Sequence, residues 1–575
     1  MKWWEMWPSR LEFEIEAFAE KEWEPRDVTS AAQVELGVRE LAICYNDSGM
    51  QLPLTVHFPP DYPFFKAYVY TDPDSTCLER HHNPINHEVC LIAGQNGWQP
   101  DMSMADLLSQ NMPKVLKISE DPGGDFAAKH EEPQGEPLSA YLNYTVGTSF
   151  LVADISPPEG VNEGYFTASR TSNHQGVHLV LTEIKDKSKR SVSISDDLNN
   201  LFDGNESFEG YWKRIRISSP GEAKELNNDV KLCELVNKAL YRKKAGSISG
   251  KGFLFGVVFE QESEHGKYDL AWRVVYAEPI YQKSRNRRKF QKPVGSRLLA
   301  LKFENYSREH RQARIPELAS LTSKTVTIVG CGMLGSQVAI KLAQSGIKEL
   351  KLIDGDTIDA STTVRYALGL EFCSIPKVEA LKSYIERNYP FTSLKAINYM
   401  IGTPVDSNNA DKREDAMSAL ENTDMVIDAA AEPSSLSYFL SCKNRQNIKP
   451  MLVVTTRPGT WGGEVWNISD PDGPCWECLQ CYQREQTLPI PNGNDESPQI
   501  QPAGCASLTV EGYGFDSDII SLHAVRAAAG ILTDDEYPTP QWQALNINLR
   551  SPDGVNAVEQ IQTFKFSQHP KCRSH

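Results

Sequence analysis

Cysteine is the residue type that first suggests chemistry in this chain of 575 residues. Twelve cysteines are scattered along it without the close, even spacing of a disulfide framework. The N-terminal segment carries four glutamates in its first sixteen residues, so it lacks the apolar core of a signal peptide. We therefore expect a reducing, cytoplasmic location, where a cysteine is a core residue, a metal ligand or a nucleophile.

Two single cysteines lie in segments where a thiol would be accessible. Cys90 follows a polar turn in NPINHEVCLIAGQNGWQP, residues 83–100. Cys505 follows a polar, proline-rich stretch in PAGCASLTVEGYGF and precedes an amphipathic helix. A flexible arm before a helix N-terminus lets a thiol move and lowers its pKa toward the thiolate, although an isolated cysteine is more often a core residue.

A glycine-rich turn, VGCGMLG, carries the next chemical signal. Its glycines follow a predicted strand at 325–330 and open a predicted helix at 334–346; they are Gly330, Gly332 and Gly335. Glycine lets backbone N–H groups approach a phosphate at the positive end of a helix. Asp354 closes the next predicted strand, 19 residues after the last glycine, where a carboxylate accepts hydrogen bonds from ribose hydroxyls. The pattern predicts a nucleotide site without identifying the nucleotide.

The elements that must position these groups follow from chain length and hydrophobic pattern. A chain of this length is expected to form three or four domains. Residues 34–70 are predicted to be an antiparallel meander, and a helix is predicted from Ser103, which with Asp106 forms a capping-box-like start. Residues 137–280 are rich in strand-like runs, and the basic run at 283–292 is predicted to be a solvated linker. A βαβ unit from residue 325 opens a doubly wound domain.

Composition excludes two classes of partner. The net charge of −17 disfavours binding to nucleic acid or to anionic membranes. No stretch approaches the roughly 18 apolar residues that span a bilayer. We therefore expect proteins or small molecules as partners.

The residues after the glycine-rich turn carry a family resemblance. LIDGDTIDASTTVRYALG and SIPKVEAL resemble the signature of the ubiquitin-activating and molybdopterin or thiamin adenylyltransferase superfamily, over about residues 305–535. The resemblance implies ATP with Mg²⁺ and adenylation of a carboxylate, in which basic residues stabilise charge on the phosphates. The matching positions are Asp354, Asp356, Arg365 and Lys377, and an upstream helix adds Arg311 and Arg314.

Three positions depart from that signature. Thr362 and Tyr366 replace the family's asparagine and glutamine, and Ala431 stands where an aspartate usually serves magnesium. Asp428 and Glu432 are the nearest carboxylates, and Asp428 is our candidate for the nucleotide site. Family members often pair their adenylation domains, so a homodimer is expected.

Three further cysteines are evenly spaced in PCWECLQC; they are Cys475, Cys478 and Cys481. Their first pair resembles half of the four-cysteine zinc site of many of these adenylyltransferases. No second C-x-x-C follows, and only Cys505 and Cys572 remain downstream. Zinc on Cys475 and Cys478, a buried structural pair and a disulfide all remain open.

The segments around the two single cysteines resemble further thioester enzymes. The Cys505 segment resembles the catalytic-cysteine segment of activating enzymes in bacterial conjugation operons. PPDYPF, HHN, VCLI and GWQP occur in the order typical of the ubiquitin-conjugating fold, which implies that Cys90 carries a thioester. The family's His-Pro-Asn is HHN here, which implies Asn83 as donor to the oxyanion of aminolysis, with His87 as the alternative base or donor.

Both ends of the chain together resemble the fused activating and conjugating enzymes of bacterial CBASS antiphage operons. The implied fold class is multidomain α/β and α+β, with a ubiquitin-conjugating domain at 1–125, a β-rich connector at 137–292 and a doubly wound, Rossmann-like adenylation domain at 295–575. The implied partners are target lysines and an acyl-donor protein, either the C-terminus of a cGAS-like nucleotidyltransferase or a ubiquitin-like protein. The alternatives are an NAD-dependent Rossmann oxidoreductase fused to a binding module, and a scaffold without catalysis.

Overall fold

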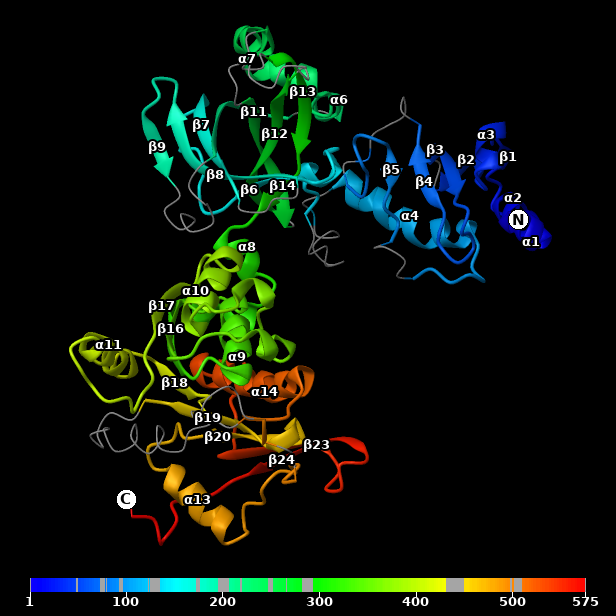
Figure 1. The fold of residues 1–575 in the computed structure, drawn as a ribbon. Helices are drawn as coiled ribbons and strands as arrows, with labels where there is room; N and C mark the ends of the chain where they lie inside the picture. Colours follow the sequence, from blue (N-terminus) through cyan, green and yellow to red (C-terminus); the bar gives the residue numbers. More distant parts are fainter. Residues whose placement is uncertain are drawn as a thin grey trace. The chain divides into compact units, whose positions relative to one another are not determined.

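The chain forms two compact units, the first extending to Tyr306 and the second beginning at Ser307 (Figure 1). This computed structural model describes residues 2–47, 50–72, 78, 80–92, 97–121, 124, 135–171, 176–194, 206–217, 220–246, 252–264, 266–281, 293–430, 449–496, 499–500 and 509–573. Within these ranges, every helix is too short or too polar to cross a membrane.

The first unit begins with an antiparallel sheet of five strands in chain order. The strands are β1 (Arg26–Asp27), β2 (Arg39–Asp47), β3 (Met50–Phe58), β4 (Tyr68–Thr71) and β5 (Glu88–Val89). The predicted meander is confirmed, except that Val34 lies in a short helix, α3 (Ala31–Glu35). The helix forms because Ser30 and Gln33 satisfy each other's backbone N–H groups in a capping box.

Helices cover one apolar core shared with this sheet. They are α1 (Trp3–Met6), α2 (Pro8–Glu20) and α4 (Met104–Glu120). The predicted cap of α4 is confirmed, since Oγ of Ser103 accepts the Asp106 N–H at 3.0 Å. Just before it, Nε1 of the buried Trp98 donates to the Pro63 carbonyl at 2.8 Å. The tryptophan therefore ties the PPDYPF turn to the chain entering α4.

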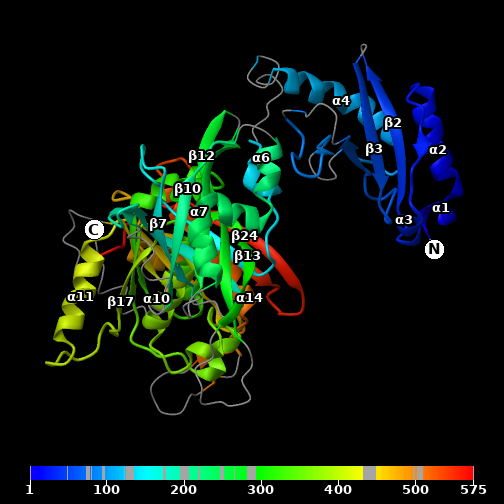
Figure 2. The same ribbon diagram turned by 90° about the horizontal axis from the view of Figure 1, so that it is seen from above.

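The rest of the first unit is built on a sheet of nine strands, in the order β13-β12-β11-β10-β7-β8-β6-β14 with β9 beside β8. The strands are β6 (Thr148–Val152), β7 (Glu163–Arg170), β8 (Val177–Asp186), β9 (Ser191–Ile194), β10 (Ser207–Arg214), β11 (Phe253–Glu264), β12 (Lys267–Tyr281), β13 (Pro293–Leu301) and β14 (Phe303–Asn305). The helices are η1 (Leu138–Tyr141), α6 (Pro220–Glu225) and α7 (Asp229–Gly246). Helix α7 lies along β11 and β13 on one face of the sheet (Figures 1 and 2).

This sheet also contains the chain around the predicted boundary at 295. Leu301 of β13 pairs with Val274 of β12, and Phe303 of β14 pairs with Phe150 of β6. Both strands therefore belong to the first unit, and the second unit starts about a dozen residues later than the sequence suggested. The predicted solvated linker at 283–292 lies outside the described residues.

The second unit is a doubly wound sheet, as predicted. Five parallel strands in the order β17-β16-β15-β18-β19 are continued by antiparallel β20, β23 and β24. The strands are β15 (Thr325–Val329), β16 (Glu349–Ile353), β17 (Ser393–Ile397), β18 (Met425–Asp428), β19 (Met451–Thr456), β20 (Gly462–Asn467), β23 (Ala544–Arg550) and β24 (Ala557–Phe564), with a separate pair, β21 (Gln499–Ile500) and β22 (Thr509–Val510). The helices are α8 (Arg308–Gln312), η3 (Pro316–Ser323), α9 (Met333–Gln344), η4 (Ala360–Val364), η5 (Leu370–Phe372), α10 (Lys377–Asn388), α11 (Ala410–Glu421), η6 (Pro458–Thr460), α13 (Trp476–Arg484) and α14 (Gly514–Leu532).

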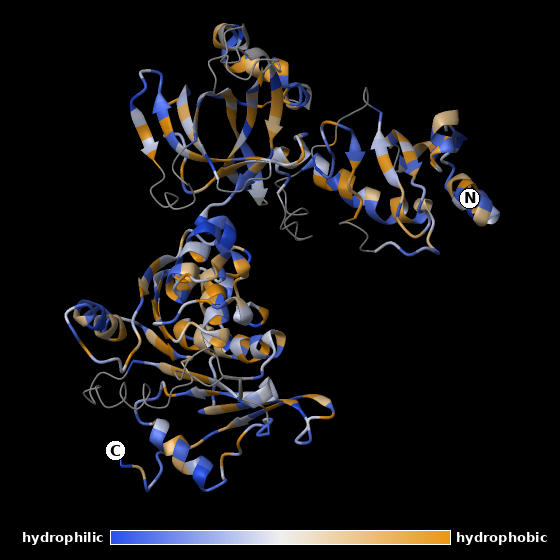
Figure 3. Cartoon of the chain, viewed as in Figure 1, coloured by the Kyte–Doolittle hydropathy of each residue, from blue (hydrophilic) through white to orange (hydrophobic). Residues whose placement is uncertain are grey.

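Helices cover both faces of this sheet. One core joins α9, α10 and α14 to the strands, and a second core joins α11 and α13 to the other side of them. Figure 3 shows apolar residues concentrated on the strands and on α9 and α14, whereas α11 is mainly hydrophilic. The arrangement places three layers around the parallel strands, as a doubly wound fold requires.

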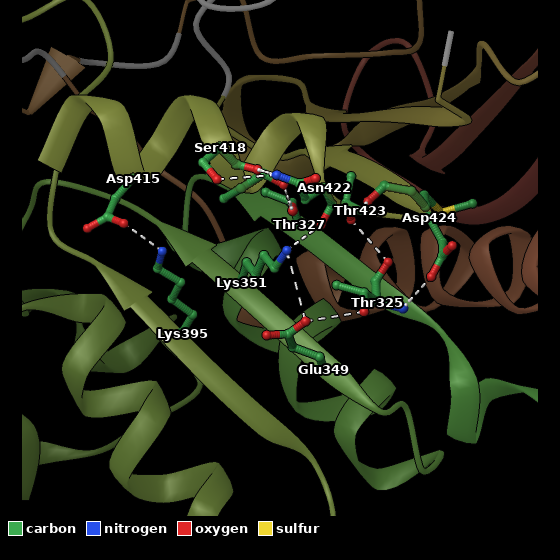
Figure 4. A network of polar contacts seen from close by, with 12 residues as sticks. Thr325, Thr327, Glu349, Lys351, Lys395, Asp415, Ser418, Asn422, Thr423 and Asp424 are labelled. Carbon is green, nitrogen blue, oxygen red and sulfur yellow. Dashed lines mark hydrogen bonds and ion pairs between the residues drawn. The ribbon is translucent and has the colours of Figure 1, made fainter. Parts of the chain in front are cut away.

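Polar contacts hold the hydrophilic α11 to the sheet (Figure 4). Oγ1 of the fully buried Thr327 donates to the Ala419 carbonyl at 2.8 Å, and Nζ of Lys351 donates to the Asn422 carbonyl. At the sheet edge, Lys395 and Asp415 form an ion pair at 2.6 Å. These bonds satisfy polar side chains beneath the helix, which would otherwise be costly to bury.

Candidate functional site

The strand order of the second unit defines a crevice at the carboxyl edge of its sheet. The chain leaves β15 toward β16 on one side, while β18 lies on the other side of β15, so the connections diverge at this point. Ligands of doubly wound sheets bind where the order reverses in this way. Val329, the last residue of β15, pairs with Asp428, the last residue of β18. The glycine-rich turn and Asp428 therefore meet at the switch point.

The three glycines of the turn serve different purposes. Gly330 has φ +80°, and a Cβ on it would lie 2.5 Å from the backbone of Ala430. A Cβ on Gly335 would lie 1.9 Å from the Gly330 carbonyl oxygen, so this glycine permits close packing of helix on turn. A Cβ on Gly332 would meet no atom of the described residues within 4 Å. Gly332 is the N-cap of α9 and brings no capping side chain, so open space lies where a phosphate would approach the helix.

Asp354 fixes the shape of this turn. One carboxylate oxygen accepts the Cys331 N–H at 2.7 Å, and the other accepts the Asp356 N–H at 2.8 Å. Each oxygen can accept a further hydrogen bond, for example from a ribose hydroxyl. Cys331 itself is fully buried, and burial raises the pKa of its thiol well above the usual value. This cysteine is therefore part of the core and unsuited to act as a nucleophile.

Lys377 joins the same group of side chains at the start of α10. Its Nζ lies 2.8 Å from Oδ2 of Asp356, and its side chain is 19% exposed. Burial opposes its charge, but the carboxylates of Asp354 and Asp356 outweigh that effect and raise the pKa of Lys377. The lysine is therefore cationic at neutral pH and lies beside the turn that would hold phosphates.

Arg365 is brought to the first turn of α9. A Cβ on Gly512 would lie 3.6 Å from Nη1 of Arg365, 3.7 Å from Cε of Met333 and 3.2 Å from Cγ2 of Thr460. Met333 is the first residue of α9, so the guanidinium and the helix start lie beside the same glycine. The structure thus gathers the predicted residues of the nucleotide site around one turn.

Two buried side chains complete this region. Asp428 is 3% exposed, and its Oδ1 accepts the Ala430 N–H at 3.0 Å. Tyr366 is 9% exposed, and its buried hydroxyl has no hydrogen-bond partner among the described residues. Burial raises the pKa of this phenol, with smaller contributions from Cys331 and Asp354, so the hydroxyl stays protonated and can donate a hydrogen bond. The sequence had marked Tyr366 only as a departure from a family pattern.

Ala431, Glu432 and Cys505 lie outside the described residues. The guanidinium of Arg311 stacks 4.1 Å from the centre of the Phe391 ring.

The chain just beyond Cys505 nevertheless returns to the nucleotide site. The Gly459 N–H donates to the Glu511 carbonyl at 3.0 Å, and Oγ1 of Thr460 accepts the Tyr513 N–H at 2.9 Å. Gly512, beside Arg365, follows Cys505 by seven residues.

A thiol cluster forms at the far end of this unit. Sγ of Cys475 lies 3.7 Å from that of Cys478 and 3.5 Å from that of Cys572, and all three lie within 4.8 Å of one another. Zinc–sulfur bonds of about 2.3 Å in a tetrahedron place sulfurs about 3.8 Å apart, so the spacing fits zinc thiolates. The third thiol was not assigned from the sequence. Its signal was H-x-x-C at 569–572, which matches C-x-x-C at 475–478 in spacing.

His569 supports this cluster through its backbone. Its N–H donates to Sγ of Cys478 at 3.1 Å, whereas its ring bonds to Glu485 and to the Lys571 N–H, each at 3.1 Å. Cys481 lies apart from the cluster, 3.2 Å from Arg484.

In the first unit, Cys90 is exposed at the end of β5, and its N–H donates to the His81 carbonyl at 2.7 Å. Asn83 lies in the turn before it. Oδ1 of Asn83 accepts the N–H groups of Ile85 at 2.9 Å and Asn86 at 3.3 Å. With its oxygen engaged by the turn, Asn83 has its amide nitrogen left as a donor, which is the group that an oxyanion needs.

Two histidines near Cys90 differ in their environments. His82 is 3% exposed and bonds through Nε2 to Oγ1 of Thr71 at 2.9 Å. Burial, with the charge of His87 adding to it, lowers the pKa of His82 to about 4, so this ring is neutral near pH 7. His87 is only half-buried, so its ring is the more accessible of the two.

Comparison with known proteins finds a family match in the second unit. Residues 306–573 match the ThiF family. Nearly the whole chain is similar to two proteins of Sinorhizobium fredii: y4qC, 28% identical over 531 residues (87% of this chain and 86% of that protein), and y4oA, 26% identical over 553 residues (92% and 90%). The ATP-dependent ubiquitin transferase-like protein Cap2 of Pseudomonas aeruginosa is 27% identical over 229 residues, 39% of this chain and 38% of that protein.

Proposed function

Because residues 306–573 form a ThiF-family domain, we propose that the chain activates the C-terminus of a donor protein with ATP and passes it through two thioesters to a lysine. The observation that carries the proposal is the gathering of the open glycine turn, Asp354, Lys377 and Arg365 at the switch point of the sheet. A nicotinamide dehydrogenase has no need of two cations at this place, whereas a triphosphate does.

The first step is adenylation of the donor. An oxygen of its C-terminal carboxylate bonds to the α-phosphorus of ATP while the bond from that phosphorus to the bridging oxygen breaks, and pyrophosphate leaves with the electron pair. Lys377 and Arg365 stabilise the charge that develops on the phosphates, and the N-terminus of α9 binds one phosphate group at Gly332. Asp428 is the buried carboxylate that would hold Mg²⁺, which neutralises phosphate charge when bound.

Two thiol steps follow. The Cys505 thiolate attacks the acyl carbon and AMP leaves; the Cys90 thiolate then takes the acyl group and the Cys505 thiolate leaves. Finally a lysine amine attacks the Cys90 thioester, the amide forms, the thiolate leaves, and the amine proton passes to a base such as His87. The position of Cys505 in the sequence, seven residues before Gly512, the exposure of Cys90 and the amide group of Asn83 support this relay.

The donor belongs to one of two protein classes, the C-terminus of a cGAS-like nucleotidyltransferase in antiphage defence or a ubiquitin-like protein. Similarity to Cap2, whose name describes an ATP-dependent ubiquitin transferase-like protein, supports this chemistry. The active form is a homodimer. Zinc bound by Cys475, Cys478 and Cys572 stabilises the end of the second unit.

Pyrophosphate exchange tests the first step. The full chain should exchange labelled pyrophosphate into ATP when given one of the two candidate donors, and Asp354→Ala should abolish exchange. Binding of NAD with no exchange for either donor would instead favour the oxidoreductase.

Trapping experiments test the thiol steps. Cys505→Ala should keep exchange and lose every reducible thioester, and Cys90→Ser should retain an oxygen ester on this residue. Cys44→Ser, which changes a half-buried cysteine of β2, is the matched control. If Cys478→Ala loses the thioesters and Cys505→Ala does not, the assignment of the first thiol is wrong.

A further inference from the structure

The loop that carries Asn83 and Cys90 is held by the nine-stranded sheet of the same compact unit. Arg80, just before the loop, forms an ion pair with Glu262 on β11, 182 residues away in the chain. Only 9% and 11% of the two side chains are exposed. The next residue, His81, donates its N–H to the carboxylate of Glu136. Both bonds lie at the base of the loop.

Glu262 also organises the neighbouring backbone. Its Oε1 accepts the Gly266 N–H at 2.7 Å in the turn after β11, and its Oε2 accepts the Glu136 N–H at 3.4 Å. A carboxylate with several donors in a buried place has a fixed position. The charge that holds Arg80 is therefore part of a rigid frame.

An apolar contact fixes the tip of the loop. Ile85 packs against the core on the α7 face of the nine-stranded sheet, which includes Leu142 and Phe255. The turn around Ile85 is closed by its own bonds, because the His87 N–H donates to the Asn83 carbonyl at 2.9 Å and Oδ1 of Asn83 accepts the Ile85 N–H. Whatever holds Ile85 therefore also holds Asn83, two residues earlier.

A residue of the middle region also interacts electrostatically with the Cys90 thiol. Tyr141, in η1, has its pKa raised by burial, with further contributions from Glu136 and Cys90. The phenol thus lies within electrostatic range of the Cys90 thiol. Direct contacts therefore hold the loop at its base and at its tip.

We propose that the middle region of the chain is a built-in part of the Cys90 site, in which Glu262 and Ile85 are positioning residues that hold Asn83 in place relative to Cys90. The clamp stands on the contacts alone, and its effect on amide formation rests on the proposed function. An oxyanion donor must be placed within a fraction of an ångström, and a misplacement of about 1 Å can cost on the order of 100-fold in rate.

The test uses the full chain and two kinds of variant. Glu262→Gln removes the charge that faces Arg80, and Ile85→Ser removes the apolar anchor, while Ile85→Val conserves it. Glu206→Gln is the matched control, because Glu206 pairs with Arg170 in the same sheet but both are well exposed, at 47% and 36%.

Hydrogen exchange of the amides of residues 81–90 measures the clamp without any donor. Exchange should be at least about tenfold faster in Glu262→Gln and Ile85→Ser than in Glu206→Gln, with recovery in Ile85→Val. Equal exchange in all variants would overturn the clamp.

Single-turnover discharge of the Cys90 thioester to free lysine measures its consequence. The limiting rate should fall roughly 10- to 100-fold, with an unchanged half-saturating lysine concentration and unchanged pyrophosphate exchange. Faster hydrogen exchange with normal discharge would overturn the positioning role. Absence of any thioester on Cys90 of the unaltered chain would contradict the proposed function instead, and hydrogen exchange would then decide the clamp.

Discussion

Alanine substitutions at two glycines of the nucleotide turn should impair different properties, ATP binding in one case and stability in the other. Gly332 and Gly335 are three residues apart and belong to the same motif, yet the space around them differs. In the part of the chain that the structure describes, a Cβ on Gly332 meets no atom within 4 Å, whereas a Cβ on Gly335 would lie 1.9 Å from the Gly330 carbonyl oxygen. We expect the Gly332→Ala variant to fold normally but to bind ATP poorly, and we expect Gly335→Ala to destabilise the second unit.

The magnitudes follow from these distances. Gly332 has φ −78°, a value that alanine can adopt. Alanine is a poorer N-cap residue than glycine, but it also lowers the conformational entropy of the unfolded chain. The two effects nearly cancel, so the free energy of unfolding should change by no more than about 1 kcal/mol. Gly335→Ala must move helix or turn by roughly 1 Å to relieve the overlap, which costs about 1–3 kcal/mol. ATP at 100 times its Kd stabilises the unaltered unit by about 2.7 kcal/mol. A 100-fold weaker site would retain only about 0.4 kcal/mol of that.

Hydrogen exchange of the amides of β15 and β18, with and without Mg–ATP, measures both the stability of the second unit and its stabilisation by ATP. The unaltered chain should gain protection with ATP, Gly332→Ala should show the same protection without ATP and gain almost none with it, and Gly335→Ala should lose protection in both conditions. Normal ATP protection in Gly332→Ala would refute the reasoning that phosphate occupies the open space at this N-cap. Unaltered stability of Gly335→Ala would refute the packing argument.

Three other changes have definite expected outcomes. Tyr366→Phe removes a buried hydroxyl that has no partner among the described residues, so the free energy of unfolding should be unchanged or about 1 kcal/mol higher. ATP affinity measured by calorimetry should fall roughly tenfold. A less stable variant with normal ATP affinity would contradict this prediction. The purified chain should hold one zinc ion by elemental analysis, Cys572→Ser should lose it and Cys481→Ser should keep it; zinc retained in Cys572→Ser would exclude the cluster as the site. Burial lowers the pKa of His82 from about 6.5 in the unfolded chain to about 4, so the unfolded chain binds more protons between these pH values. The free energy of unfolding should therefore be highest above about pH 6.5 and should fall by up to roughly 3 kcal/mol as the pH falls toward 4. Pulse proteolysis in urea at pH 7 and pH 5 should show this loss, and His82→Gln should flatten it; an equal slope in the variant would assign the pH dependence to other groups.

Local elements were predictable because short segments determine them. The strand, turn and helix around Gly330 follow from an apolar run, three glycines and a 3.6-residue period, and the cap at Ser103 depends on a residue three positions away. Where such local signals competed, the sequence misled. Val34 lies in an apolar, strand-like run, but the capping box at Ser30 made a short helix of it.

Much of the nucleotide site was predictable for a related reason. Asp354, Arg365 and Lys377 are read from one motif that follows the glycine turn closely in the chain, so a single recognised pattern places all of them near the carboxyl edge of the sheet. The lack of a hydrogen-bond partner for the buried Tyr366 hydroxyl among the described residues was not predictable, because the sequence gives the residue type but not the groups that surround it.

The doubly wound fold of the second unit and the meander of the first were predictable from the sequence alone, and so were the residues that we propose for adenylation. Only the tertiary structure brought Cys572 to Cys475, 97 residues away, joined β13 to the sheet of the first unit, and placed Ile85 and Arg80 against the core and the carboxylate that hold the Cys90 loop. Periodicity and motif spacing report the contacts of neighbours in the chain. Contacts between distant segments depend on how whole elements pack and on which buried charges find partners, and no local pattern encodes either.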